Sequence, residues 1–260
     1  MKHTRIAPDL SHFPTIFHSL LSAPVFDSSC SPEALVYFID RDQGYFLKTA
    51  PAGSLQKEAA MDRFFHEKGL GPQVISYLTD DRDWLLTARV SGEDCTHAQY
   101  LSNPKRLCDT TAQVLRQLHD TPTDGCPVLD RTAHYIATAE ENFRTGRYDT
   151  ALFPDNWGYA SAEEAIVVVR EFAPALKSDT LLHGDYCLPN ILLDNWRFSG
   201  FIDLGAGGVG DRHIDLFWGV WSLFFNLKTD AWGQRFLDVY GRDRIQPELL
   251  RAIAAFEVFG

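Results

Sequence analysis

The sequence predicts an α+β fold with two lobes: a small lobe built on an antiparallel sheet over residues 1–91, and a larger, mostly helical lobe over residues 92–260. Three observations support this prediction. Strand-like stretches in the first third fold back around polar turns, and helical spacing of apolar residues begins after Ser91-Gly92. No repeat or low-complexity linker interrupts either part, so a single joint near residues 89–92 is expected.

The small lobe is expected to contain two β-hairpins with a helix between them. A polar turn over residues 40–44 separates the first two strands, and residues 79–83 separate the next two. The four strands are residues 35–39, 45–49, 74–78 and 84–88. Between the hairpins, Ser54 is expected to cap a helix from Leu55 to about Lys68, and Gly69 is expected to end it.

The larger lobe shows helix-start signals. Asn103-Pro104 opens a helix with apolar residues on one face, and Ser161-Ala-Glu-Glu164 matches a capping box before a helix at 165–176. Helices resume from Asp215 to the end of the chain.

Composition excludes several classes of protein. The net charge of −11 argues against a nucleic-acid binder and suits a cationic small molecule. The five cysteines are odd in number and scattered, so neither a disulfide framework nor a zinc site is expected. The longest apolar stretch, residues 216–227, is shorter than the ~20 residues that span a bilayer, and the start of the chain lacks a signal-peptide core. We therefore expect a soluble, cytoplasmic protein that has no membrane association and no obligatory protein partner.

One segment combines groups that perform chemistry. Asp185, Asn190 and Asp203 lie around an expected hairpin with its turn at Trp196-Arg197. Its strands are expected at residues 191–194 and 198–202. With residue 195 paired to residue 198, counting outward places Asn190 opposite Asp203, and Asp185 lies on the loop that leads to the same end. Two carboxylates and an amide suit Mg²⁺, which takes few protein ligands and keeps water or phosphate oxygens.

This set of residues is what phosphoryl transfer requires. One Asp orients the acceptor hydroxyl, and an Asn with a second Asp holds the metal that bridges the phosphates. A lysine is then expected from the small lobe, and Lys48 lies in the strand 45–49 with Phe46 on the same face. Glu58 on the following helix is the expected ion-pair partner of Lys48.

The motifs resemble a known family. His183-Gly-Asp185, Asn190 and Ile202-Asp-Leu-Gly205 look like the protein-kinase-like fold of the aminoglycoside phosphotransferases. Residues 188–190, 198–203 and 210–215 resemble its 3′-phosphotransferase branch in particular, and order and spacing fit over nearly the whole chain. The resemblance implies transfer of the γ-phosphoryl group of ATP or GTP, with Mg²⁺, to an aminoglycoside hydroxyl, at the 3′ position, which confers resistance.

The resemblance also implies roles for individual residues. Asp185 would be the catalytic base or orienting group, and Asn190 and Asp203 would bind magnesium. Asp215 would brace the catalytic loop, with His183 in a supporting role. The implied nucleotide-binding residues are Lys48, Glu58, Ser31, Phe46, Ala88 and Val90; the implied substrate-binding residues are Asp155 and Glu257.

The acceptor side departs from the family pattern. The helix after Asp215 carries Trp221, Phe225 and Asn226 where several relatives carry charged residues, and Gly260 follows Phe259 where those relatives end in phenylalanine. Aromatic residues on this helix are either buried or form a wall for an amine cation. Two alternatives therefore stay open: a kinase of the same fold that acts on choline, an amino alcohol or a sugar, and a nucleotide-binding pseudokinase.

Overall fold

The computed structural model describes residues 4–30, 34–153 and 157–260 and divides the chain into two compact units. The first unit comprises Met1–Ser91 with Ser199–Gly205, and the second comprises Gly92–Phe198 with Ala206–Gly260. The first change of unit falls at residues 91–92, where the sequence predicts the end of the strand-rich lobe. Residues 199–205 belong to the first unit, although the sequence predicts them in the larger lobe, and they bring Asp203 into it.

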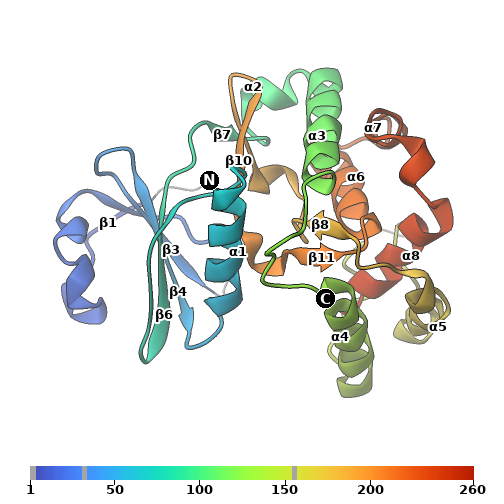
Figure 1. The fold of residues 1–260 in the computed structure, drawn as a ribbon, viewed down its shortest axis with the longest axis horizontal. Helices are drawn as coiled ribbons and strands as arrows, with labels where there is room; N and C mark the ends of the chain where they lie inside the picture. The colour runs from blue at the N-terminus through green and yellow to red at the C-terminus, as the bar shows by residue number, and fades with distance from the viewer. Residues whose placement is uncertain (1–3, 31–33, 154–156) are drawn as a thin grey trace. The chain divides into compact units, whose positions relative to one another are not determined.

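The first unit is built on a six-stranded antiparallel sheet with the strand order β1-β2-β3-β4-β6-β5. Its strands are β1 (Thr4–Ile6), β2 (Val25–Asp27), β3 (Leu35–Ile39), β4 (Tyr45–Pro51), β5 (Val74–Thr79) and β6 (Arg82–Ala88). Figure 1 shows β3, β4 and β6 within this sheet. Both hairpins expected from the sequence are present, whereas β1 and β2 are three residues each and too short for alternation to reveal them.

The two faces of this sheet carry separate apolar clusters. The first consists of Phe17, Leu21, Val25, Ile39, Leu47, Trp84 and Leu86, and the second of Ala34, Ala50, Leu55, Ala59 and Leu85. Because the second cluster includes Ala59 of α1 (Gln56–Glu67), the helix covers the Ala50 face. Residues two apart in a strand share a face, so Phe46 and Lys48 point to the side of the sheet that α1 covers.

The amino end of α1 is capped by a residue remote in sequence. The prediction that Ser54 caps this helix is wrong, because Ser54 Oγ donates to Pro51 O (2.6 Å) and does not accept from the helix. The amide of Leu55 donates to Asp83 Oδ2 (2.8 Å), a buried carboxylate on β6. An acceptor there satisfies a backbone donor that the first turn leaves unpaired. At the other end, Gly69 has the left-handed φ of 71° expected of a stop residue.

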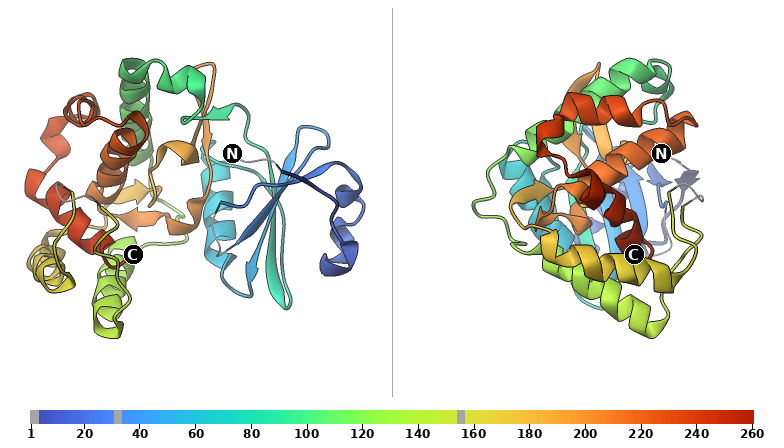
Figure 2. Two further views of the ribbon diagram at one scale, coloured as in Figure 1. Left: turned by 180° about the vertical axis from the view of Figure 1, so that it is seen from behind. Right: turned by 90° about the vertical axis from the view of Figure 1, so that its right-hand side faces the viewer.

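The second unit is mostly helical. Its helices are α2 (Ala98–Leu101), α3 (Pro104–His119), α4 (Arg131–Thr145), α5 (Ala162–Phe172), α6 (His213–Leu227), α7 (Gly233–Tyr240) and α8 (Pro247–Glu257). Its short strands are β7 (Glu93–Asp94), β8 (Thr180–Leu182), β9 (Ile191–Asp194) and β11 (Gly208–Gly210), and β10 (Arg197–Phe201) continues into the first unit. Helix α3 packs on α7, and α8 packs on both α5 and α6 (Figures 1 and 2).

Local signals in this unit were informative about where helices begin. Asn103 accepts from the amide of Arg106 (3.3 Å) and caps α3, as its sequence predicts. Ser161 accepts from the amide of Glu164 (3.1 Å), but α5 begins at Ala162 and ends at Phe172, earlier than the predicted span of 165–176.

The hairpin formed by β9 and β10 turns one residue earlier than expected. Its strands end at Asp194 and restart at Arg197, and the intervening Asn195 and Trp196 have φ values of 49° and 69°. Two consecutive residues with positive φ define the tight type I′ turn that suits hairpin twist. The predicted turn centre is therefore wrong, and so is the pairing of Asn190 with Asp203 that was counted from it.

No helix in the described part of the chain is long and apolar enough to cross a membrane.

Candidate active site

Lys48 is the centre of an ion-pair cluster in the first unit. Its Nζ donates to both carboxylate oxygens of Glu58 (2.8 Å each) and to Asp203 Oδ1 (2.9 Å). Burial disfavours the charge on Lys48, but Glu58 and Asp203 together hold the pKa of its ammonium above the ordinary value. The predicted ion pair between Lys48 and Glu58 is therefore present, and Asp203 is a second partner of Lys48 that the sequence did not predict.

Asp203 has an unusual backbone. Its φ is 61°, in the left-handed region that a non-glycine residue adopts at a cost of order 1–3 kcal/mol. Its side chain is 54% exposed, although one oxygen accepts from Lys48. A strained residue that presents a carboxylate to solvent is a candidate for a ligand contact.

Of the other residues predicted to bind a nucleotide, Phe46 and Ala88 lie on the sheet of the first unit, and Val90 follows strand β6. Phe46 is half-buried and packs on Phe38, with ring centroids 5.2 Å apart. The amide of Ala88 donates to Gln73 O (2.9 Å), so this amide already has an acceptor, and Val90 is half-buried. Ser31 lies outside the described residues.

A further acidic residue on α1 was not found from the sequence. Asp62 lies one turn after Glu58 and is 3% exposed, and its Oδ1 has no hydrogen-bond partner in the described chain. Burial raises its pKa well above the ordinary value, and the charge of Glu58 raises it further. Burial and the nearby Glu58 carboxylate therefore both disfavour the charged form of Asp62. In the sequence it looks like one more polar residue on a wet helix face.

In the second unit, Asp185 and Asn190 are joined directly. Asn190 Nδ2 donates to Asp185 Oδ2 (2.8 Å) and to Asp185 O (3.0 Å), and the amide of Cys187 also donates to that carbonyl (2.8 Å). The amide of Asp185 donates to Nδ1 of the buried His183 (3.3 Å). These contacts fix the orientation of the Asp185 carboxylate, which remains partly exposed.

Asp215 holds the start of this loop. Its two oxygens accept from the amides of His183 (2.8 Å) and Gly184 (2.7 Å), and His119 Nε2 lies 3.2 Å from Oδ2. Burial lowers the pKa of His119, so a neutral ring donates to Asp215 and accepts from Tyr240 at Nδ1 (2.8 Å). The resemblance implied that Asp215 braces this loop, but no sequence motif pointed to His119 or Tyr240.

Asp215→Asn is expected to lower the free energy of unfolding by about 2–4 kcal/mol, because the amide group can no longer accept from both backbone donors in a fully buried position. The measurement is urea unfolding followed by tryptophan fluorescence, with Asp179→Asn, an exposed Asp, as the matched control. Equal midpoints for the two variants would contradict the bracing role.

Glu257, near the end of α8, lies close to this loop. It is 7% exposed, and its Oε1 accepts from Tyr135 Oη (2.6 Å) and Trp218 Nε1 (3.0 Å). Burial raises the pKa of Glu257 to about 7, against the lowering effect of these hydrogen bonds, and the charge of Asp185 raises it further. The two carboxylates are therefore within electrostatic reach of each other. Asp155, the other predicted acid, falls in a segment that the structure leaves undescribed.

The aromatic side of α6 is only partly buried. Phe217 and Leu223 are in the core, but Trp218 and Trp221 are half-buried and Phe225 is 50% exposed. Burial in the core therefore does not explain why α6 carries aromatic side chains on its partly exposed side.

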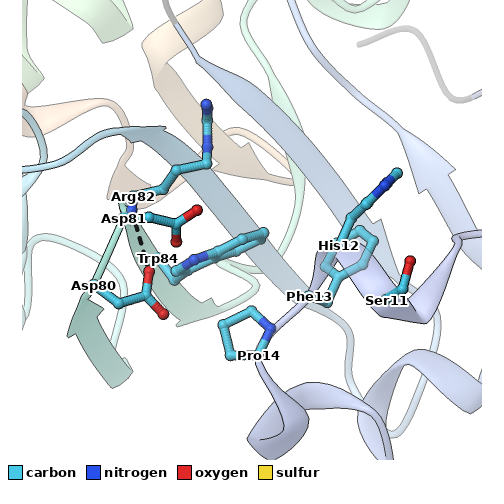
Figure 3. A pocket seen from close by; sticks show the side chains of 8 residues that line it. All are labelled: Ser11, His12, Phe13, Pro14, Asp80, Asp81, Arg82 and Trp84. Atoms are coloured by element: carbon cyan, nitrogen blue, oxygen red, sulfur yellow. Dashed lines mark hydrogen bonds between the residues drawn. The ribbon is translucent and has the colours of Figure 1, made fainter.

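A hollow of about 460 Å³ lies elsewhere on the first unit. Figure 3 shows that it is lined by residues 11–14 and by the turn between β5 and β6, where the Arg82 amide donates to Asp80 (3.1 Å). Trp84 in its wall belongs to the apolar cluster on the sheet face opposite Lys48. This hollow contains none of the predicted site residues.

Comparison with known proteins agrees with this geometry. The model of the phosphotransferase enzyme family matches residues 32–254. A probable aminoglycoside 3′-phosphotransferase of Lactococcus lactis subsp. lactis (strain IL1403) is 48% identical, over 100% of this chain and 99% of the relative. The crystal structure of an aminoglycoside 3′-phosphotransferase of type VIII is 26% identical, with a TM-score of 0.72 over 90% of this chain and 92% of that one. An aminoglycoside phosphotransferase of Streptomyces rimosus, solved with ADP and streptomycin, shares the fold at 21% identity and a TM-score of 0.71, over 97% of this chain and 98% of that one.

The fold and the matched relatives define the class: this protein is a phosphotransferase with a kinase-like α+β fold, as its sequence predicts. The chain belongs to the phosphotransferase enzyme family, and the resemblance to the aminoglycoside 3′-phosphotransferases is confirmed.

Proposed function

We propose that this enzyme transfers the γ-phosphoryl group of ATP or GTP to the 3′-hydroxyl of an aminoglycoside in the cytoplasm, and so confers resistance. The observation that carries the proposal is the fixed Asp185–Asn190 pair, combined with the Lys48–Glu58–Asp203 cluster. The full-length relative at 48% identity, named as a probable aminoglycoside 3′-phosphotransferase, supports the choice of acceptor.

The residues present fit a magnesium ion. Asp203 offers a half-exposed carboxylate. Asn190 commits its Nδ2 to Asp185, and its Oδ1 accepts from no donor in the described ranges, so that oxygen is available as a ligand. One carboxylate and one amide oxygen suit Mg²⁺, which keeps several water or phosphate oxygens. When bound, the ion would neutralise charge that develops on the phosphates.

Side chains of the protein itself would bind the nucleotide and orient the acceptor hydroxyl. Lys48 carries a charge that Glu58 and Asp203 hold in place, and it would bind the phosphates of the donor. Phe46, on the same sheet face, would stack on the base. Asp185 would accept the hydrogen bond of the acceptor hydroxyl, orient its oxygen for attack and take its proton as the new P–O bond forms.

Glu257 is proposed to bind an ammonium group of the acceptor. It is a buried carboxylate near Asp185 with one oxygen held by Tyr135 and Trp218. With its pKa at about 7, half of it is neutral at pH 7, and a cationic acceptor would favour the charged form.

This assignment predicts a pH effect. Wild-type kcat/KM for the acceptor is expected to rise as pH increases from 6 to 8, because the Glu257 carboxyl ionises around pH 7. Glu257→Gln is expected to flatten that rise and to lower kcat/KM at pH 8 about tenfold through loss of a charged hydrogen bond. The measurement is kcat/KM for the acceptor as a function of pH in both proteins. Parallel profiles would show that Glu257 does not bind the acceptor.

Ionisation of Glu257 with rising pH is expected to lower the stability of the folded protein, although it raises kcat/KM. Its folded pKa of about 7 exceeds the ordinary 4.5, so the folded state binds the proton more tightly, and stability is lost as pH rises between these values. The loss amounts to about 3 kcal/mol at pH 7 and above, and Glu257→Gln is expected to abolish it. Urea unfolding at pH 5 and pH 8 measures the difference.

The aromatic side of α6 could instead serve a choline-type acceptor. However, Lys228 Nζ already lies 4.1 Å from the centroid of the exposed Phe225 ring, where a quaternary ammonium would stack. This contact favours the aminoglycoside over choline.

The test is coupled release of nucleoside diphosphate with Mg-ATP and Mg-GTP against kanamycin, neomycin, ribostamycin, choline and no acceptor. Turnover with the aminoglycosides and a phosphate at the 3′ position by NMR would support the proposal. Turnover with choline alone would overturn the acceptor, and nucleotide binding without turnover on any acceptor would favour a pseudokinase.

A further inference from the structure

Helix α6 is apolar on most sides, but three of its polar side chains fall in one line. After His213, the polar side chains of α6 other than tryptophan are Asp215, Ser222 and Asn226. They are spaced by seven and then four residues, close to two turns and one turn of a helix with 3.6 residues per turn. All three therefore lie on one side of α6, and we call them the polar stripe.

The polar stripe contacts both ends of the catalytic loop, residues 183–190. Asp215 accepts from the amides at the start of the loop. Ser222 Oγ accepts from the amide of Leu188 (2.9 Å), near the end of the loop. Asn226 Nδ2 donates to Ser222 O (2.8 Å) and to Ser222 Oγ (3.3 Å), so the serine is itself held in place.

The Ser222 hydroxyl is buried, with the residue only 1% exposed. A buried hydroxyl costs free energy unless it is hydrogen-bonded, and a serine within a helix often bonds to a carbonyl of the preceding turn. Ser222 Oγ instead accepts from Leu188, the last amide before Pro189, which has no amide hydrogen. The hydroxyl therefore serves the loop rather than the packing of α6.

The peptide group between Cys187 and Leu188 connects α6 to Asn190, the proposed magnesium ligand. Its N–H donates to Ser222 Oγ, and its carbonyl accepts from the amide of Asn190 (3.0 Å). Because a peptide group is planar and rigid, fixing its N–H also fixes the direction of its carbonyl. The amide of Cys187 in turn donates to Asp185 O (2.8 Å). One peptide group anchored on α6 is thus bonded to the residues on both sides of it.

We propose that Ser222 is a positioning residue for phosphoryl transfer. Its hydroxyl, supported by Asn226, sets the orientation of this peptide group and through it the placement of Asp185 relative to Asn190. A misplacement of about 1 Å can lower a rate by up to about a hundredfold, so one buried hydrogen bond is enough to affect turnover. The inference rests on the proposed function, since it takes Asp185 as the base and Asn190 as a metal ligand.

The experiment compares the wild type with variants of one buried hydroxyl. Ser222→Ala removes the acceptor, and Ser222→Thr restores it. Thr132→Val is the matched control, because Thr132 is 4% exposed on α4 and its Oγ1 donates to Lys177 O (2.7 Å), outside the catalytic loop. Kinetics with kanamycin give kcat, both KM values and the Mg²⁺ concentration for half-maximal rate. Hydrogen–deuterium exchange of peptides that cover residues 183–190 reports on the loop without turnover, and thermal melting verifies folding.

Ser222→Ala is expected to lower kcat about tenfold and to raise the Mg²⁺ requirement about threefold, with both KM values within about twofold of wild type. Exchange in residues 183–190 should become faster, because the Leu188 amide loses its acceptor. Ser222→Thr should recover kcat to within about threefold of wild type. Thr132→Val should melt at a lower temperature with unchanged kcat and Mg²⁺ requirement, which is also what a merely structural role would predict for Ser222→Ala.

Wild-type kcat and Mg²⁺ requirement in folded Ser222→Ala would overturn the inference, and so would equal losses of kcat in the folded alanine and threonine variants. If Ser222→Ala does not fold, Ser222→Cys takes its place under the same criteria, because a thiol fills the same space but is a weak acceptor.

Failure of the proposed function is distinguishable from failure of this inference. If the wild type turns over no aminoglycoside, the proposed function fails, but exchange in residues 183–190 still shows whether Ser222 holds the loop. Unchanged exchange rates in Ser222→Ala would overturn the inference whatever the acceptor is.

Discussion

Asp185→Asn is expected to lower kcat for phosphoryl transfer by about a thousandfold and to leave nucleotide binding intact. The substitution keeps the size of the side chain, and an amide oxygen can still accept from Asn190 Nδ2. It removes the carboxylate that would take the proton of the acceptor hydroxyl. Because Cys187 donates to the backbone carbonyl of residue 185, the shape of the loop is expected to survive.

The measurement is diphosphate release at saturating acceptor, with nucleotide affinity from titration calorimetry in the presence of Mg²⁺. Asp194→Asn, at an exposed carboxylate in the following hairpin, is the matched control and is expected to behave like wild type. Activity of Asp185→Asn within tenfold of wild type would show that another group takes the proton.

The site residues that the sequence could identify are those fixed by a local motif or by strand alternation. His183-Gly-Asp185 leads into a loop whose geometry depends on a positive φ of 87° at Gly184. A Cβ at Gly184 would lie 2.1 Å from Ala206 O, so the spacing of the motif reflects a steric requirement. Alternation along β4 likewise places Lys48 and Phe46 on one face.

The contacts that the sequence could not reveal join residues far apart in the chain. Asp83 caps α1 from a strand 28 residues later, and no signal near Ser54 excludes that residue as the cap. His119 meets Asp215 across 96 residues. Tertiary packing determines which residues meet in this way, and local sequence preferences carry no information about such long-range contacts.

The prediction of the hairpin turn was wrong for a different reason. Asn195-Trp196 adopts two positive φ values, but turns of this kind are recognised from glycine in the second position. Tryptophan at φ 69° gives no such signal. It is held there by its surroundings, where its ring packs on Tyr100 (4.9 Å) and under Arg106 (4.4 Å).

Lys48→Met is expected to have the second largest effect, and it separates catalysis from stability. Loss of the ammonium removes the phosphate-binding charge, so kcat/KM for the nucleotide should fall by about a hundredfold or more. It also leaves Glu58, a side chain only 10% exposed, without its cation. The free energy of unfolding is therefore expected to fall by about 2–3 kcal/mol at pH 8, since breaking a buried pair leaves an uncompensated charge.

The double variant Lys48→Met with Glu58→Gln distinguishes the two effects. Removing the second charge is expected to recover most of the lost stability, because no unpaired Glu58 carboxylate then remains in this buried position. Activity should stay lost, because Asp203 and the donor phosphates still lack the ammonium. Urea unfolding and diphosphate release are measured on all variants, with Lys68→Met, at an exposed lysine at the end of α1, as control. Recovery of activity in the double variant would mean that Lys48 serves only to neutralise Glu58, and that some other cation binds the phosphates.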